Sequence, residues 1–416
     1  MLRFQWVLLL LWAGIAGAAE GPSSPLGLEP GTRRLCNDDL GVIVWGPDSA
    51  PTLSVGKSDV WDRRLPAGEN RIITLKELIE GAKNSDPAIV KGAPWYRAYN
   101  NYDFPCPKPV GQLILRLPFV TESGKVSCRE NPREVVLTAE NGDKKLQLKI
   151  FVSAVRNVIV IQGSAQRLQP GDLAIRLWRH RDTILPGGEV HPTLGGGNSP
   201  KDFEQLAPPR AGQNDDLFWV AQDFPGEATF PDGFTASLVC SAGDVAADYE
   251  MVEGTAGLGT PMVAPQEGRI AHGLTKRFTP INESPGACAT ATLRAIPESF
   301  VIYATAATTQ DDSDPLSHAA KVLAEAKALG VDALWTEHVR QLDAYDAGTR
   351  GQAVAADGRV LLDFPWGGVP YRMRPQGYYG DVPLCSVDST KFCYQDSGMW
   401  HADFHFNEVE ATGSCI

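Results

Sequence analysis

The sequence predicts a mainly β protein, with a large antiparallel sandwich over residues 36–309 and a helical linker over residues 310–348. Three observations predict this class. Short apolar segments alternate with Gly, Pro, Asn and Asp between Cys36 and Thr309, one of these segments carries a clear hairpin signal, and the apolar period becomes helical from Asp311. Strands that follow one another without intervening helices are typical of an antiparallel sandwich and not of a parallel βα fold.

The composition supports a globular chain and disfavours one class of partner. The 416 residues include 43% hydrophobic and 21% charged residues, a balance that allows a large buried core. This length is typical of two or three domains. The formal net charge is -12, and an acidic surface repels phosphate. We therefore expect no nucleic-acid partner.

The N-terminus has the pattern of a secretory signal peptide. Arg3 precedes an apolar run over residues 6–18, and Ala-Gly-Ala at 16–18 fits the small-x-small cleavage rule. An uncleaved membrane anchor is the alternative, but a membrane span needs roughly 20 apolar residues. We therefore expect a signal peptide over residues 1–18, a Pro-, Gly- and Ser-rich linker over residues 19–35, a secreted (extracellular or periplasmic) protein, and no membrane association after cleavage.

The cysteine content fits an oxidising compartment, but it does not fix a disulfide pattern. The chain has eight cysteines, and eight cysteines allow about 105 pairings. Cys106 with Cys128 and Cys385 with Cys393 are the local candidates. A zinc ribbon is excluded because no CxxC pair exists.

The clearest strands lie in residues 135–152. A strand over 135–139 is followed by Asn141-Gly142, the strongest hairpin turn signal, and then by apolar residues at every second position up to Val152. Further strands are predicted over residues 157–163, 173–178, 217–224, 234–240 and 299–306. The opening segment over residues 36–64 reads as a hairpin in the sandwich core that ends in an aromatic edge at Trp61.

Two helices are predicted after the sandwich. The first has Ser313 or Asp314 as its N-cap, Pro315 at its first position and Gly330 at its end. The second ends before Gly348. Its apolar face is formed by Leu334, Trp335, Val339, Leu342 and Tyr345. We expect the two to form a helical hairpin.

The most concentrated chemistry lies at residues 400–408. His401, Asp403 and His405 would share one side of a strand and could ligate a metal ion, although no fourth ligand is identifiable. The second interpretation is a sugar site. Flat faces that can stack on a pyranose come from Trp400, Phe404 and Phe406, and groups for hydroxyl contacts or proton transfer come from Asp403, His405, Asn407 and Glu408. The third is an exposed tail with this composition by chance.

A serine hydrolase is disfavoured. Ser241-Ala242-Gly243 supplies the second half of the G-x-S-x-G pattern, but Val239 stands where the first glycine should be. The sharp turn that exposes such a serine is therefore not encoded.

Three stretches in order resemble glycoside hydrolases of the family 95 (α-L-fucosidase) type and their six-hairpin relatives. "DDLGVIVWGPDSAPTLSVGKSDVWDRR" resembles their opening strands, and "TTQDDSDPLSHAAKVLAEAKALGVDALWTEHVRQLDAYD" resembles their helical linker. "GMWHADFHFNE" resembles a segment early in their catalytic barrel.

The resemblance implies an N-terminal β-supersandwich, a helical linker, an (α/α)6 barrel that hydrolyses glycosidic bonds, and no cofactor. It implies catalytic roles for Asn407, His405 and Asp403, of which Asn407 matches the asparagine chemistry of the fucosidases. We assign substrate binding to Trp400, His401 and Glu408. Residues 349–416 would be an incomplete start of the barrel, so we expect a truncated gene product or half of a split enzyme.

The sequence therefore supports a secreted glycoside hydrolase-like protein whose substrate is an oligo- or polysaccharide. The alternative is a secreted carbohydrate-binding or interaction module without turnover. A metal-dependent hydrolase is a third hypothesis.

Overall fold

The computed structural model describes most of the predicted sandwich and both helices. The described residues are 34–62, 84, 106–121, 124–181, 206–260, 285–349, 353–354 and 360–362, without residues 38, 58, 109, 132, 228 and 229. The fold is mainly β, as the sequence predicts.

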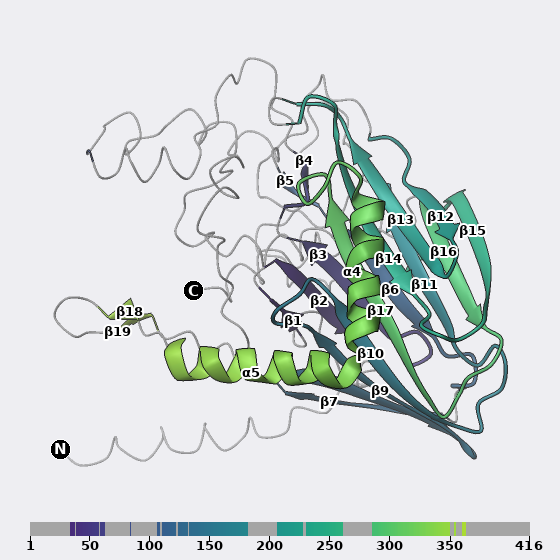
Figure 1. Cartoon of the computed structure of the whole chain (residues 1–416). Helices are drawn as coiled ribbons and strands as arrows, with labels where there is room; N and C mark the ends of the chain where they lie inside the picture. The colour runs from purple at the N-terminus through teal and green to yellow at the C-terminus, as the bar shows by residue number, and fades with distance from the viewer. Residues whose placement is uncertain are drawn as a thin grey trace, which may run out of the picture.

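Two large antiparallel sheets form the body of the protein (Figure 1). Sheet A has seven strands in the order β1 (Arg34–Cys36), β2 (Leu40–Trp45), β3 (Thr52–Lys57), β6 (Gly111–Arg116), β11 (Ala174–His180), β16 (Gly286–Leu293) and β15 (Ala247–Thr255). Sheet B has eight strands in the order β12 (Arg210–Asn214), β13 (Leu217–Phe224), β14 (Phe234–Ser241), β17 (Ser299–Thr308), β10 (Ile159–Gln166), β9 (Lys144–Val152), β8 (Glu134–Asn141) and β7 (Lys125–Asn131).

Two smaller pairs of strands complete the β structure of the described residues. They are β4 (Trp61–Asp62) with β5 (Cys106–Pro107), and β18 (Ala353–Val354) with β19 (Val360–Leu362). The predicted barrel segment begins with Thr349, which is the last residue of a helix, and includes this second pair; its other residues, up to 416, lie outside the described residues.

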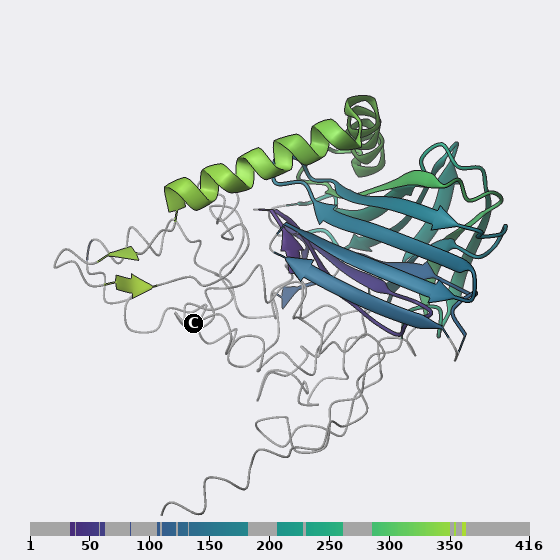
Figure 2. The ribbon, with the colours of Figure 1, turned by 90° about the horizontal axis from the view of Figure 1, so that it is seen from below.

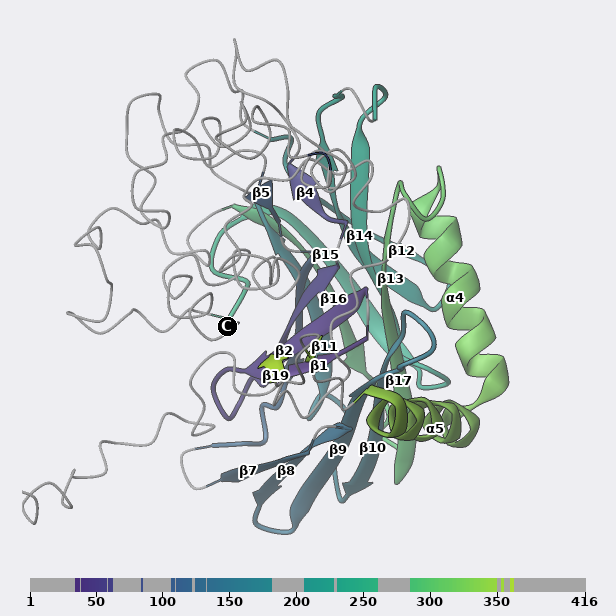
Figure 3. The ribbon, with the colours of Figure 1, turned by 90° about the vertical axis from the view of Figure 1, so that its left-hand side faces the viewer.

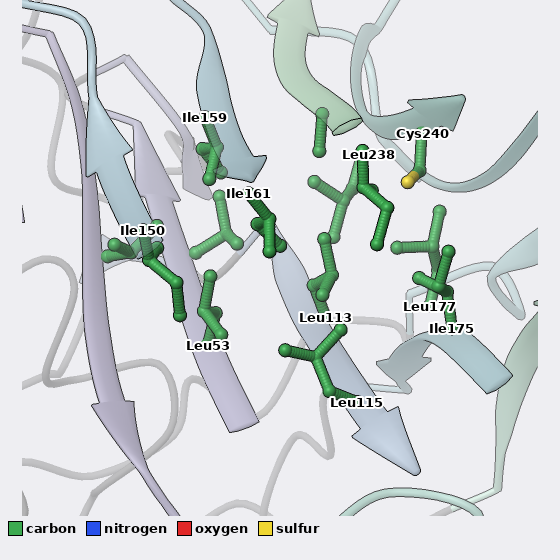
Figure 4. Packing of buried hydrophobic residues seen from close by; sticks show 14 of the residues in the cluster. Leu53, Leu113, Leu115, Ile150, Ile159, Ile161, Ile175, Leu177, Leu238 and Cys240 are labelled. Carbon is green, nitrogen blue, oxygen red and sulfur yellow. The ribbon is translucent and has the colours of Figure 1, made fainter. Parts of the chain in front are cut away.

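The main core lies between the two sheets. Leu53 and Leu113 of sheet A belong to one apolar cluster with Ile150, Ile161 and Leu238 of sheet B (Figure 4). All five side chains are at most 1% exposed, and burying one such side chain stabilises a fold by about 1.5–3 kcal/mol. The sandwich is therefore closed by aliphatic contacts between the facing sheets.

Sheet B is buried on both faces where the two helices cover it. Along β10, Ile159 and Ile161 face sheet A, whereas Val160 packs in a second cluster with residues of the two helices. These helices are α4 (Pro315–Leu329) and α5 (Val331–Thr349). Figures 2 and 3 show them on the side of sheet B that faces away from sheet A. The described fold thus has three layers, with sheet B in the middle.

The first helix begins and ends as predicted. Asp314 is the N-cap of α4 and accepts a 3.2 Å hydrogen bond from the backbone N–H of Ser317. Pro315 occupies the first turn, and Gly330 ends the helix with φ +82°. The second helix runs beyond its predicted end, because Gly348 lies inside α5.

The prediction that the two helices form a helical hairpin is wrong. Gly330 is the only residue between the two helices, and Figure 1 shows α5 leading away from α4 instead of returning along it. Antiparallel helices need a loop of about 2–5 residues to reverse the chain. A one-residue joint makes a corner instead.

All of the predicted strands are present, and the hairpin turn is displaced by one residue. In the β8–β9 hairpin, Asn141 still pairs with Lys144, so the turn residues are Gly142 and Asp143. Gly142 has φ +62°, which glycine adopts without a steric cost. Within the described residues, neither helix is long and apolar enough to cross a membrane.

Candidate functional site

The six residues predicted to form a sugar site lie outside the described part of the chain. They are Trp400, His401, Asp403, His405, Asn407 and Glu408. Their catalytic and substrate-binding roles stay predictions, as does the metal-binding alternative for three of them. Among the described residues, no group of three or more His, Cys, Asp and Glu side chains is placed to hold a metal ion.

The described residues contain a buried cluster of charges, which we call the Lys57 cluster. Its members are Lys57, Asp39, Asp59 and Asp311. Nζ of Lys57 lies 2.8 Å from Oδ2 of Asp59, 3.1 Å from Oδ2 of Asp39 and 3.0 Å from Oδ2 of Asp311. An ammonium group has three protons to donate, and three carboxylates surround it here.

The members of the Lys57 cluster lie at the ends of strands. Lys57 is the last residue of β3 and follows the inward-facing Val55 by two positions, so its side chain points to the same side. Asp39 directly precedes β2, Asp59 follows β3, and Asp311 follows β17 of the opposite sheet. The cluster therefore joins sheet A to sheet B and to the turn that leads into α4.

Neutral groups add further hydrogen bonds around the cluster. Asn157 donates from Nδ2 to Oδ2 of Asp39 at 2.5 Å. The hydroxyl of Thr308 donates to Asp59, and the backbone N–H of Thr308 donates to Oδ2 of Asp311 at 3.0 Å. Hydrogen bonds of this kind offset part of the cost of removing charges from water.

The surroundings of the cluster raise the pKa values of Lys57 and Asp59. Burial alone would lower the pKa of Lys57, but the charges of Asp59, Asp39 and Asp311 outweigh burial and raise it above its ordinary value. Burial raises the pKa of Asp59, and the carboxylates of Asp39 and Asp311 raise it further, against the opposing effect of Lys57. Lys57 is therefore charged at neutral pH.

The geometry of the Lys57 cluster fits a structural role better than a catalytic role. The side chains of Lys57, Asp39 and Asp59 are 0% exposed, and that of Asp311 is 12% exposed. A general acid or base must come within hydrogen-bonding distance of its substrate. Groups so fully occupied by one another hold the strand ends in place and do not act on a ligand.

A second set of contacts, which we call the α5 anchor, holds α5 against sheet B. Trp335 and His338 of α5 pack on Phe151 of β9, with ring centroids 5.2 Å and 5.0 Å from the Phe151 ring. Nζ of Lys149 lies 3.2 Å from the centroid of the Trp335 ring, in the position of a cation–π contact. His338 is buried, and both of its ring nitrogens contact backbone atoms of sheet B connections.

The serine of the incomplete hydrolase pattern is not a nucleophile elbow. Ser241 is the last residue of β14, is fully buried and donates a 2.9 Å hydrogen bond to Oδ2 of Asp216. The same oxygen accepts a 2.7 Å hydrogen bond from Nζ of Lys327. Ser241 therefore ties sheet B to α4.

The described fold is thus a two-sheet β-sandwich with a pair of helices packed on its sheet B. No family model matches the sequence, and no curated protein sequence matches it either.

The solved structures that are similar to the chain include two sugar-processing enzymes. One is a bacterial glucoamylase in complex with acarbose, at 10% sequence identity and a TM-score of 0.34, with 78% of this chain and 39% of the glucoamylase covered. The other is a putative kojibiose phosphorylase from the human microbiome, at 9% identity and a TM-score of 0.27, with 74% of this chain and 34% of that protein covered. This chain therefore spans less than two-fifths of the length of either protein.

Proposed function

We propose that this chain is the N-terminal sandwich and linker of a secreted glycoside hydrolase-like protein, one that acts on glycosidic bonds of carbohydrates or descends from enzymes that do. The observation that carries the proposal is the Lys57 cluster. It joins two stretches that resemble this group of enzymes although they are far apart in sequence: Lys57 comes from the first stretch and Asp311 from the second.

The cluster gives the resemblance a physical basis. Lys57, Asp59 and Trp61 are part of the first resembling stretch, and two of these three side chains are the buried cation and one of its anions. The second stretch supplies Asp311 at its start and Trp335 of the α5 anchor further on. Both resembling stretches therefore contribute side chains that hold the fold together, which supports the proposal.

The described residues do not supply the chemistry of hydrolysis. Glycoside hydrolysis needs two carboxyl groups on opposite sides of the scissile bond, with space between them for substrate. The carboxylates gathered in the Lys57 cluster are buried around a single ammonium group. Catalysis in this proposal therefore depends on Asp403, His405 and Asn407, which lie outside the described residues.

The test is the release of free sugar from synthetic fucosides and galactosides by the purified full chain. We expect release from at least one of them, and its loss in Asn407→Ala. Asn214→Ala is the matched control, because Asn214 is an exposed asparagine at the end of β12. No release by the wild-type chain, or equal release by Asn407→Ala, would contradict an enzymatic role.

A non-catalytic carbohydrate-binding module is the second candidate. The full burial of Asp39 and Asp59 favours it, since a binding module needs no acid and base that reach the substrate. Glycan-array binding without release of sugar would support this function. Binding should then weaken in Trp400→Ala and persist in Asn214→Ala.

A further inference from the structure

We propose that His338 is a proton-operated latch, which holds α5 against sheet B when the imidazole is neutral and releases the helix when it is protonated. The proposal concerns the α5 anchor alone and is independent of any activity on carbohydrates. It rests on the two hydrogen bonds of the ring and on the charges that surround it.

Both ring nitrogens of His338 are engaged by backbone atoms with fixed roles. The backbone N–H of Ala154, in the β9–β10 connection, donates to Nδ1 at 3.2 Å. Nε2 lies 2.9 Å from the carbonyl oxygen of Arg133, in the connection from β7 to β8. A backbone N–H can only donate and a carbonyl oxygen can only accept, so Nδ1 is the acceptor and Nε2 carries the proton. The structure therefore specifies the neutral ring in a single tautomer.

The hydrogen bonds of the His338 ring leave no acceptor for a second ring proton. It would bind Nδ1, where it would face the N–H of Ala154, and the hydrogen bond between them would become a contact between two donors. The ring of His338 is 3% exposed, so water does not replace the lost partner. The protonated ring is accommodated only if α5 moves away from the β9–β10 connection.

The surrounding charges also disfavour the imidazolium. Arg133 on the β7–β8 connection and Lys149 on β9 are cations near the ring, whereas the carboxylate of Glu134 is shared with Lys149 at 3.1 Å. On α5 itself, Glu337 is paired with Arg156 and Asp343 is paired with Arg133. The anions near the ring are therefore already balanced by other cations.

The pKa of His338 agrees with this geometry. Burial lowers it below the ordinary value of 6.5, and the nearby Arg133 and Lys149 lower it further, while the hydrogen bond to the Arg133 carbonyl and the charge of Glu134 act in the opposite direction. A released helix would have an ordinary histidine, which binds a proton more readily. The docked state is therefore fully stable above about pH 6.5 and loses stability as the pH falls from there to the pKa of the docked ring.

Release would be confined to α5. Ala319, Leu323 and Ala326 hold α4 against sheet B through buried contacts that do not titrate, and Gly330 interrupts the helical conformation between α4 and α5. The two ion pairs that α5 makes with sheet B connections, Glu337 with Arg156 and Asp343 with Arg133, are partly exposed and contribute little by themselves.

The test is hydrogen exchange of the full chain followed by mass spectrometry, from about pH 7.5 to about pH 5, the range in which histidine titrates. Rates are corrected for the intrinsic pH dependence of exchange. We expect the protection of α5 peptides to fall about tenfold per pH unit below about pH 6.5, as uptake of one proton requires. Peptides from β10 serve as the reference and should keep their protection.

Two variants identify the histidine responsible. In His338→Gln, the side-chain amide can accept and donate without titrating, so α5 should stay protected throughout the range. His318→Gln removes the histidine of α4 and should keep the wild-type pH dependence. Exchange of the imidazole C2 proton in the wild-type chain measures the pKa of His338 directly, so the proposal stays testable if His338→Gln does not fold.

Three results would overturn the latch. Protection of α5 that does not change with pH would show that no release occurs. A parallel loss in α5 and β10 would show general unfolding instead. A His338→Gln variant with the wild-type pH dependence, or a C2-exchange pKa of 6.5 or above, would show that another group is responsible.

Discussion

Nζ of Lys57 lies 3.0 Å from Oδ2 of Asp311, and 254 residues separate the two along the chain. This contact connects the β2–β3 hairpin to the turn before α4. Because Asp39 and Asp59 share the same ammonium, removal of Lys57 would leave three carboxyl groups together in a buried place.

We therefore expect Lys57→Met to lower the free energy of unfolding by about 3–5 kcal/mol at neutral pH, the cost of breaking a buried ion pair from one side. Urea unfolding measures this change. The difference in unfolding free energy between Lys57→Met and the wild-type chain should become smaller in acid, because the carboxyl groups can then be neutral. Lys145→Met is the control: its ion pair with Glu140 is exposed, and its loss should cost about 0–1 kcal/mol. Equal effects of the two variants would show that the Lys57 cluster does not stabilise the fold.

The N-cap of α4 offers a second prediction. Asp314→Ala should lower the free energy of unfolding by about 1 kcal/mol, because the first turn loses a hydrogen bond to its backbone N–H groups. Ser313→Ala is the matched control, since Ser313 is the neighbouring candidate and bonds only to Asp312 among the described contacts. An equal loss in both variants would contradict the assignment of the cap.

The same cap predicts a pH dependence. Hydrogen bonds from Ser317, first from its side chain and then from its backbone, lower the pKa of Asp314 below 3.8. The carboxylate therefore contributes its full stabilisation above about pH 3.8, and this contribution is lost as the pH falls through the lowered pKa. Unfolding of Asp314→Asn should lack this component, which a comparison of wild-type and variant stability in acid would detect.

A glycine in the centre of sheet B makes space for an aromatic ring. Gly163 of β10 is paired with Phe300 of β17, and a Cβ atom at position 163 would overlap the ring. We expect Gly163→Ala to destabilise the fold by about 1–3 kcal/mol in thermal or urea unfolding, as overpacking does. Ser164→Ala, on the exposed face next to it, should be nearly neutral. Adding Phe300→Leu to Gly163→Ala should cost less than the sum of the two single changes, and additive losses would contradict the overlap.

Two buried thiols should be unreactive in the folded protein. Cys240 of β14 and Cys288 of β16 are buried and are not in disulfides, and burial raises the pKa of both thiols. Because the thiolate is the reactive form, we expect neither residue to be alkylated by iodoacetamide in the native protein at about pH 8. Both should be alkylated in guanidinium chloride, as peptide mass spectrometry can determine. Labelling of either in the native state would contradict the packing.

The sequence identified most strands whose apolar residues are large, although it missed β6 with its buried Leu113, Ile114 and Leu115. It also missed strands whose residues are small or exposed. β10 and β17 were predicted because Val, Ile, Phe and Tyr recur along them. β16 is almost entirely buried but consists mainly of Gly, Ala and Thr, so it carries little hydrophobic signal. β12 is an edge strand whose residues are partly or fully exposed, and its sequence resembles that of a loop. The order of strands within each sheet depends on contacts between distant segments, which no local pattern contains.

The buried charges could be predicted only in part. The hairpin over residues 36–64 was expected to lie in the core, but the Lys57 cluster was not expected. The sequence contained one indication of the cluster, because Lys57 continues the inward-facing series of Leu53 and Val55. A charged residue in an inward position needs a buried partner of opposite charge. That Asp311 is one of these partners depends on the packing of sheet B against sheet A. Similarly, His338 shares the buried stripe of Leu334 and Leu342, but its polarity kept it out of the predicted apolar face.

The place of β17 in sheet B has a consequence for how the protein is made. β17 is the last strand of that sheet to be synthesised, yet it lies between β14 and β10 and separates the sheet into two groups of strands. Until the ribosome has released residue 308, both groups present open strand edges that can pair with other chains. Nascent chains of this protein should therefore depend on chaperones until that strand emerges, and any fragment that stops before Ser299 should aggregate.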